Sequence, residues 1–393
     1  METEERLNER TAAKARFFNF DHVMVCVFVF IFAAILLLLS VNLSIFNPLR
    51  RALDDFSMTD IYYQILNDES ARELNDKIVL VDMTKQYRRE DIAKTISDVS
   101  HCKPKVMMVD VIFERITDND MGNAALVASL EKAPNTVLAC KLYNYDENAN
   151  AFKNCLYSFF ESMGHYDWAF SNVISKFNYG TIREYSISQN LNGKRIYSMP
   201  YMTACRYFGT KPQKESVNNR YIVYSNTDFP VVSCDSILAN RNLLKDRIVM
   251  IGTLQEEADM HLTPVGKMPG MKILAYSALS YIDHRNIQTI DLWKSILLLF
   301  VVCYISAFIG FRIIHRFPET NSLLLNIYYF CMAALLVWVG FISFVKFDYE
   351  INLLYPLLGL ALVEPARMHY KWIIRIMKTK TKWGFPTKSI YYD

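Results

Sequence analysis

The chain has 393 residues, and its 43 lysines and arginines against 40 aspartates and glutamates give a formal net charge of +3. This near balance excludes a polybasic nucleic-acid-binding protein and an acidic disordered one, so we expect no nucleic acid partner. Apolar residues make up 52% of the chain and charged residues only 21%. Because the apolar excess falls in blocks near the two ends, the sequence predicts a membrane protein that carries one soluble domain.

The first apolar block, residues 23–46, contains no charged residue. As an α-helix it would extend roughly 36 Å, which is enough to cross a bilayer with some tilt. A cleaved signal peptide is the alternative, but the block is longer than the apolar region of a signal peptide and no small-residue cleavage site closes it. We therefore predict a membrane helix at 23–46, preceded by an N-terminal arm at 1–22.

Three more apolar blocks lie near the C-terminus. Two of them are uncharged and long enough to span a bilayer, whereas the third is short enough that a re-entrant or interfacial segment is a fair alternative. Glu364 and Pro365 follow the third block, and we expect the proline to close that helix. The predicted membrane helices are 294–314, 322–345 and 349–365.

The distribution of lysine and arginine decides how many spans are predicted. The N-terminal arm, the loop after the second span and the C-terminal tail all carry lysine or arginine residues. Cytoplasmic segments collect such residues, and these three segments share one side only if the number of spans is even. We therefore predict four spans, two cytoplasmic termini, an outside domain at 47–292 and a basic cytoplasmic tail at 366–393.

The outside domain alternates strand and helix patterns, which indicates parallel strands joined by right-handed crossovers. The predicted fold is therefore α/β, mainly parallel and Rossmann-like, with an antiparallel insert rich in Tyr, Asn and Ser at 142–220. The predicted strands are 77–82, 105–113, 136–140, 221–225 and 247–252, with short antiparallel strands near 180–198. The predicted helices are 88–100, 119–132, 198–208, 233–239 and 270–282.

Polar residues and a glycine follow the central strands of this predicted sheet. Asp82, Asp110 and Gly252 each end a strand, and Asp259 and His261 follow in the next loop. Since the carboxyl ends of parallel strands line the ligand crevice of such sheets, these residues are candidates for binding a cation or a polar ligand. The alternative is that the aspartates cap helices or hold loops by hydrogen bonds.

No motif in the sequence points to catalysis. Two candidate ligands in an Asp-x-His spacing are too few for a metal site, and neither a P-loop nor a GxGxxG motif follows any strand. We therefore expect no catalytic residue, no metal and no cofactor. Among the five cysteines of the domain, Cys140 and Cys155 would close a short loop as a disulfide, and free buried thiols are the alternative.

Several segments of the domain resemble the second type of CHASE domain, the extracellular sensor found ahead of bacterial cyclases, histidine kinases and serine/threonine kinases. KIVLVD and VMMVDVIFE resemble its first strands, GTIR resembles its Gly-x-x-Arg hairpin, and the segment from IVMIG to the Pro-Gly-opened helix resembles its C-terminal signature. The resemblance adds Arg183 to the ligand-binding candidates. Two positions depart from the family pattern: Leu274 replaces a frequent histidine, and residues 84–86 replace an Asp-x-x-Ser segment.

The resemblance implies a multi-pass receptor of the bacterial cytoplasmic membrane whose periplasmic domain senses a small ligand or an envelope component. Family members usually continue into a cytoplasmic output domain, whereas about 28 residues follow Pro365 here. We therefore expect signalling in trans to a separate cytoplasmic or membrane protein, with self-association as a homodimer. The alternative is a scaffold subunit of an envelope complex that uses the same domain without a signal.

Overall fold

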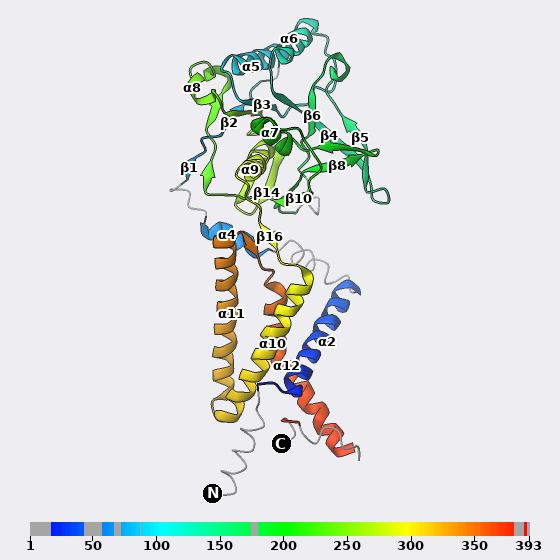
Figure 1. Cartoon of the computed structure of the whole chain (residues 1–393), viewed down its shortest axis with the longest axis vertical. Helices are drawn as coiled ribbons and strands as arrows, with labels where there is room; N and C mark the ends of the chain where they lie inside the picture. The colour runs from blue at the N-terminus through cyan, green and yellow to red at the C-terminus, as the bar shows by residue number, and fades with distance from the viewer. Residues whose placement is uncertain are drawn as a thin grey trace. The chain divides into compact units, whose positions relative to one another are not determined.

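The computed structural model describes residues 17–42, 57–66, 72–86, 88–173, 180–380 and 389–390. The chain forms two compact units (Figure 1). One is an α/β unit, Thr59–Ile287, and the other is a helical unit made from Met1–Met58 and Gln288–Asp393. The predicted N-terminal arm up to residue 16, the end of the first predicted span from residue 43 and most of the predicted tail after residue 380 lie outside the described residues.

The α/β unit is built on one nine-stranded sheet with the strand order β12-β2-β13-β3-β4-β5-β8-β9, in which β6 also pairs with β4. The parallel part consists of β12 (Val231–Ser233), β2 (Ile78–Asp82), β13 (Ile248–Gly252), β3 (Val106–Val109), β4 (Thr136–Asp146) and β6 (Asp167–Phe170). The insert adds β5 (Ala151–Leu156), β8 (Ser188–Leu191) and β9 (Lys194–Tyr197), where β5 is antiparallel to β4 and β9 to β8. This sheet confirms the predicted mainly parallel α/β fold.

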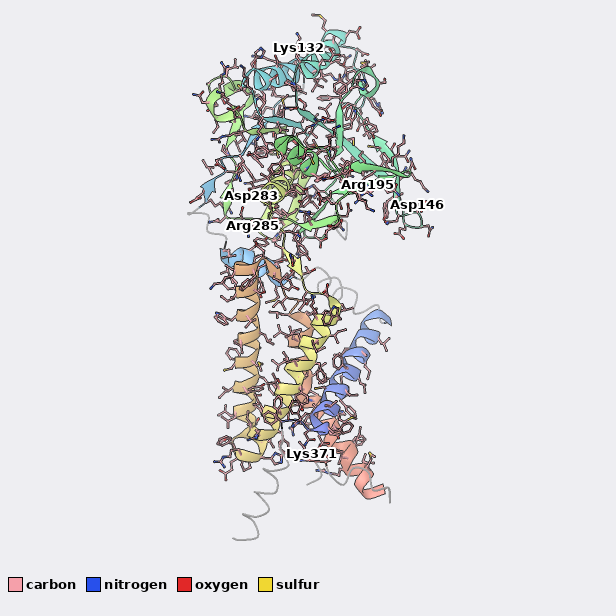
Figure 2. All side chains as sticks on the ribbon, viewed as in Figure 1. Lys132, Asp146, Arg195, Asp283, Arg285 and Lys371 are labelled. Atoms are coloured by element: carbon pink, nitrogen blue, oxygen red, sulfur yellow. The ribbon has the colours of Figure 1, made fainter. Side chains whose placement is uncertain are left out.

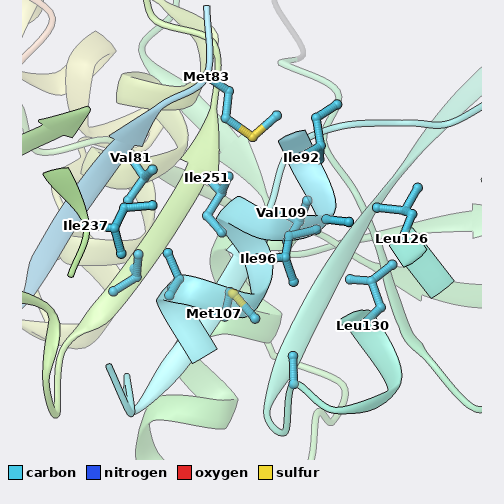
Figure 3. Packing of buried hydrophobic residues seen from close by; sticks show 14 of the residues in the cluster. Val81, Met83, Ile92, Ile96, Met107, Val109, Leu126, Leu130, Ile237 and Ile251 are labelled. Carbon is cyan, nitrogen blue, oxygen red and sulfur yellow. The ribbon is translucent and has the colours of Figure 1, made fainter. Parts of the chain in front are cut away.

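Helices cover both faces of the sheet (Figure 1). Residues 78–81 of β2 and all residues of β3 and β13 are buried, as expected for parallel strands enclosed on both sides. Figure 3 shows the core on one face, where Val81, Val109 and Ile251 pack among Ile96 and Leu126. These two helical side chains belong to α5 (Arg89–His101) and α6 (Asp120–Glu131); the other face carries α7 (Met199–Phe208) and α9 (Gly270–Ile282).

The ends of two helices follow from local sequence. The side chain of Asn119 accepts a hydrogen bond from the backbone N–H of Gly122 at 3.0 Å, which caps the start of α6. Pro200 occupies the first turn of α7, where its missing N–H has no helical partner to lose. Gly209 ends α7 with a φ of 69°, a left-handed conformation that suits glycine.

The predicted elements between residues 221 and 239 are wrong in detail. The predicted strand at 221–225 is replaced by β10 (Asn219–Tyr221), which pairs with β7 (Glu184–Ser186), and β12 supplies the edge strand of the main sheet. Beyond β10 the strand pairing is replaced by a hydrogen bond to a side chain: the N–H of Val223 donates to Ser280 Oγ of α9 at 2.9 Å. In place of the predicted helix at 233–239 there is a 3₁₀ turn, Cys234–Ser236, followed by α8 (Arg241–Leu244).

The remaining elements of the α/β unit are short and lie outside the main sheet. The first residue of helix α4 (Met58–Leu66) belongs to the helical unit, and its residues from Thr59 onward belong to the α/β unit. Strand β1 (Glu73–Leu74) pairs with β11 (Thr227–Asp228), and β14 (Met260–Thr263) forms a hairpin with β15 (Gly266–Pro269).

The described part of the helical unit contains four long helices: α2 (Phe20–Asn42), α10 (Leu292–Arg316), α11 (Asn321–Phe347) and α12 (Leu354–Lys380). A two-residue parallel pair, β16 (Gln288–Thr289) with β17 (Tyr349–Glu350), joins the chain before α10 to the chain after α11. Helices α2, α10 and α12 share a core that includes Val25, Cys303, Ala307 and Val363.

The expectation that Pro365 closes the last helix is wrong, because α12 continues through it to Lys380. A proline inside a helix removes a hydrogen bond and costs about 3 kcal/mol. Here the second half of α12 repeats buried residues at a spacing of four, Ala366, Tyr370 and Ile374, which pack into the same core as α2 and α10. This packing offsets the cost of the proline.

Among the described residues, α10 and α11 are the two helices long and apolar enough to cross a membrane. The described apolar part of α2 is shorter, Phe20–Leu36, and α12 falls short because charged residues begin at Glu364, ten residues after its first residue. Two of the four predicted spans are therefore supported by length and composition.

Candidate functional site

The carboxyl ends of three parallel strands meet at one edge of the sheet. Gly252 at the end of β13 lies opposite Asp82 at the end of β2, and the N–H of Met83 donates to the carbonyl of Gly252 at 2.8 Å. On the other side of β13, the N–H of Asp110 donates to the carbonyl of Ile251 at 2.9 Å. Three of the sequence-derived candidates therefore stand in a row, as the strand-end pattern predicts.

Asp82 holds two loops together. Its Oδ1 accepts hydrogen bonds from the backbone N–H of Thr84 at 3.0 Å and of Leu254 at 3.3 Å, and its Oδ2 accepts one from the side chain of Gln255 at 3.3 Å. The hydroxyl of Thr84 also accepts from the backbone N–H groups of Leu254 and Gln255. These bonds give Asp82 the loop-holding role that the sequence left open as its alternative.

Asp110 has a different environment, with few partners for its charge. Burial and, to a smaller extent, the nearby carboxylate of Asp259 raise the pKa of its carboxyl to about 7, against a hydrogen bond with Ser171 that acts in the opposite direction. Ser171 directly follows β6, so a fourth strand end contributes to the same edge. Asp110 therefore exchanges its proton close to neutral pH.

Asp259 connects this edge to the first turn of α9. Its Oδ2 accepts the backbone N–H of Gly270 at 3.0 Å, and its Oδ1 lies 3.3 Å from Nε2 of His261. The carboxylate thus satisfies a free N–H at a helix start, where negative charge is favoured. The side chains of Asp259 and His261 are 40% and 32% exposed, so both are open to a ligand from solvent.

Two glycines allow these groups to approach one another. A Cβ on Gly270 would lie 2.7 Å from both carboxylate oxygens of Asp259. A Cβ on Gly252 would lie 2.7 Å from the sulfur of Met271 and 3.4 Å from Cβ of Asp110. Glycine at both positions therefore lets the start of α9 pack directly onto the strand ends.

Arg183 binds a carboxylate of its own chain. Its Nε and Nη2 donate to the two oxygens of Asp60 on α4 at 2.9 and 2.5 Å, the two-pronged geometry that suits guanidinium and carboxylate. The backbone around Arg183 joins two neighbours: the N–H of Ile182 donates to the carbonyl of Leu262 in β14 at 2.8 Å, and the N–H of Ile222 donates to the carbonyl of Arg183 at 2.7 Å. Arg183 therefore acts as an anchor for α4.

Sequence reasoning missed several residues that shape the site: Thr84, Ser171, Gly270 and Asp60. Three of them act on partners far away in the chain, such as Asp60 on Arg183, and no local pattern marks such pairs. Gly270 carried a usable signal, because a glycine at the start of a predicted helix marks a close approach of another group.

The structure describes no group of three or more metal-ligating side chains in residues 17–42, 57–66, 72–86, 88–173, 180–380 and 389–390. Cys140 and Cys155 are free thiols on the neighbouring strands β4 and β5, and their side chains hydrogen-bond to each other. The hydrogen bond with Cys155 and burial raise the pKa of the Cys140 thiol, so it stays protonated and unreactive.

Comparison with known proteins identifies the domain. The family model of the CHASE2 domain matches residues 25–308, which is most of the chain. No curated protein and no solved structure matches the chain.

Proposed function

The chain belongs to the CHASE2 domain family of extracellular sensory domains, and we propose that it is a receptor of the bacterial cytoplasmic membrane. In this proposal α2, α10, α11 and the first part of α12 cross the membrane, both termini are cytoplasmic, and the α/β unit is periplasmic. The unit binds a small polar ligand or an envelope component. In the same proposal, the signal passes to a separate cytoplasmic or membrane protein.

One feature carries this proposal: a single loop contacts α9, through which the chain leaves the α/β unit, and is linked through the Arg183 segment to α4, through which the chain enters it. Asp259 caps the start of α9, and α9 leads to the chain that continues into α10. Three residues further on, the carbonyl of Leu262 in β14 accepts a hydrogen bond from the N–H of Ile182. The next residue is Arg183, whose side chain binds Asp60 on α4. A ligand at Asp259 and His261 is therefore connected to both flanking segments.

Binding produces a signal only if the ligand interacts differently with two arrangements of the unit. A cationic or hydrogen-bond-donating ligand would compete with Gly270 and His261 for the oxygens of Asp259. It would also shift the proton on Asp110, whose pKa depends on the charge of Asp259. The ligand class that suits the site is thus small, polar and positively charged, and the proposal involves binding without catalysis.

Cross-linked capture from native membranes tests this function. We expect the wild-type chain to retain a separate signalling protein, and Asp259→Asn to change the captured amount at least twofold, because the substitution removes the charge at the loop. Asp235→Asn is the matched control, since Asp235 is exposed and is not among the described hydrogen-bond partners of Asp259.

Two outcomes would contradict the proposal. A fixed complex of constant composition that is unchanged by Asp259→Asn would identify the chain as a scaffold subunit. The absence of any captured protein, with a chain that remains folded, would exclude signalling in trans. Cross-linking between identical chains would show the proposed homodimer in the same experiment.

A further inference from the structure

A groove of about 880 Å³ runs along the helical unit, lined by α11 and α12 with one residue of α10. Its lining changes character along its length. One end is apolar and includes Ala333, Leu357, Leu360 and Ala361. The other end is polar and basic, so the groove is amphipathic.

The basic end is formed by a stripe on one face of α12. Arg367, Lys371 and Arg375 follow one another at a spacing of four residues, which places them on the same side of the helix. Figure 2 marks Lys371 on α12. One carboxylate lies among them, Glu364, and it binds Arg367 with an Nε–Oε2 distance of 3.0 Å. Among the lining residues that the structure describes, three cations and one carboxylate give the groove excess positive charge.

The start of α11 faces this stripe across the groove. Asn321, Ser322 and Asn326 line the groove there, and Asn321 and Ser322 are the first two residues of the helix. The first N–H groups of a helix have no helical partner and carry a partial positive charge, so they attract anions. Basic side chains and a helix start thus converge on the same end.

We infer that this groove binds an anionic phospholipid of the cytoplasmic leaflet. The phosphate lies between Lys371, Arg375 and the start of α11, and an acyl chain follows the apolar end toward Ala333 and Leu357. Basic pockets between membrane helices on the cytoplasmic side are the type of site that binds acidic headgroups. The inference rests on the proposed four-span topology, which places this end of α12 at the cytoplasmic surface.

The dimensions and composition of the groove suit a lipid better than a free phosphate ion. From Asn321 to Ala333 the helix rises about 18 Å, close to the depth of one leaflet of a roughly 30 Å hydrocarbon core. A free ion would leave that apolar stretch without a partner. Trp372, which is 58% exposed beside the basic stripe, suits the membrane interface.

The test compares lipids on the purified full-length chain in neutral detergent, by native mass spectrometry and thermal melting. We expect phosphatidylglycerol to remain bound and to raise the melting temperature, whereas phosphatidylcholine and glycerol phosphate have no such effect. Lys371→Gln with Arg375→Gln should weaken phosphatidylglycerol binding at least tenfold. The control removes two charges elsewhere in the helical unit, Lys294→Gln with Lys346→Gln, and should bind like the wild type.

Three results would overturn the inference: equal binding by the stripe variant, equal binding of phosphatidylcholine, or glycerol phosphate binding as tightly as the lipid. The stripe variant must melt like the wild type without lipid, which shows that it is folded; if it does not, the single variants replace it.

A cysteine at Ala361 separates failure of the lipid site from failure of the topology. It should resist a water-soluble maleimide in nanodiscs of either lipid if α12 is embedded. If the cysteine is protected but phosphatidylglycerol does not bind selectively, the lipid site is rejected and the membrane span of α12 is retained. If the cysteine reacts, the span itself is rejected.

Discussion

Asp82 and Asp110 show how two aspartates at equivalent strand ends acquire different roles. The oxygens of Asp82 accept hydrogen bonds from two loops, which fixes the loops. Asp110 has the carboxylate of Asp259 nearby and is partly buried, which disfavours its charge. The strand-end pattern locates both residues, but their partners come from distant segments that sequence spacing cannot reveal.

Asp110→Asn should remove a pH-dependent loss of stability. The pKa of Asp110 is raised from 3.8 to about 7, so the folded state holds its proton more tightly than the unfolded state. Stability therefore falls as the pH rises from about 4 to about 7, by up to about 4 kcal/mol, and stays lower above that range. Denaturant unfolding across this range should show the variant more stable at pH 8 and similar to the wild type at pH 4.

Asp235→Asn is the control for that experiment, because it removes an exposed carboxylate with no comparable environment. Its unfolding curves should follow those of the wild type at every pH. If the difference between Asp110→Asn and the wild type did not change with pH, the shifted titration of Asp110 would be refuted.

Gly270→Ala should release the cap on α9. The new Cβ would meet the Asp259 carboxylate at 2.7 Å, so that side chain must rotate away from the helix start. Loss of an N-terminal cap costs about 1 kcal/mol, and hydrogen exchange at the first amides of α9 should accelerate. Asp259→Asn serves as the comparison, since asparagine caps as well as aspartate. Unchanged exchange in the alanine variant would argue against the cap.

At the scale of elements, the ion pair between Arg183 and Asp60 ties α4 to the α/β unit. The two side chains are only 15% and 24% exposed, so the pair is poorly screened by water. Tyr63 adds a second tie, because its hydroxyl donates to the carbonyl of Ile222 at 3.2 Å. Helix α4 is thus bound through two side chains to the segments around Arg183 and Ile222, and the segment around Arg183 also hydrogen-bonds to β14.

A double-mutant cycle with Arg183→Gln and Asp60→Asn measures this tie. The pair should show a coupling energy of about 1–3 kcal/mol in unfolding, and either single variant should increase hydrogen exchange in α4. The surface pair Arg206 and Asp167, whose side chains are 39% and 31% exposed, provides the control and should couple by less than about 1 kcal/mol. Equal coupling in the two cycles would contradict a special role for Arg183.

Sequence reasoning predicted the strongly patterned elements well. β2, β13 and α9 lie close to their predicted ranges, because continuous apolar runs and a Pro-Gly start give clear local signals, whereas β3 ends at Val109, four residues before its predicted end. The short edge strand β12 was missed, since three residues that pair at a sheet edge carry little pattern. The position of β13 between β2 and β3 could not be predicted either, because it depends on pairing between segments that are far apart in the sequence.

The end of α12 shows the opposite failure, in which a strong local rule misleads. Proline predicts a helix end, yet the apolar spacing of Ala366, Tyr370 and Ile374 continues beyond it. That spacing was present in the sequence, but it stabilises the helix only when α2 and α10 pack against these side chains, and the sequence does not show that packing. Tertiary packing therefore decided where the helix ends.

At the scale of the whole molecule, the chain can act as a receptor only if the helical unit is embedded in the membrane and the α/β unit lies outside the cytoplasm. The α/β unit holds the candidate site, and the helical unit holds both helices that are long and apolar enough to span a membrane. The loop with Asp259 and His261 is connected within its own unit to α4 and α9. All functional inferences above depend on the α/β unit facing the outside.

Labelling with a membrane-impermeant maleimide in sealed, right-side-out vesicles tests this orientation most directly. Cysteines are introduced at Lys132, exposed on the α/β unit (Figure 2), and at Arg316, exposed at the end of α10, with Cys155, Cys234 and Cys331 replaced by serine. We predict that position 132 reacts in intact vesicles and position 316 only after lysis. Labelling of position 132 only after lysis would place the α/β unit inside and contradict the receptor.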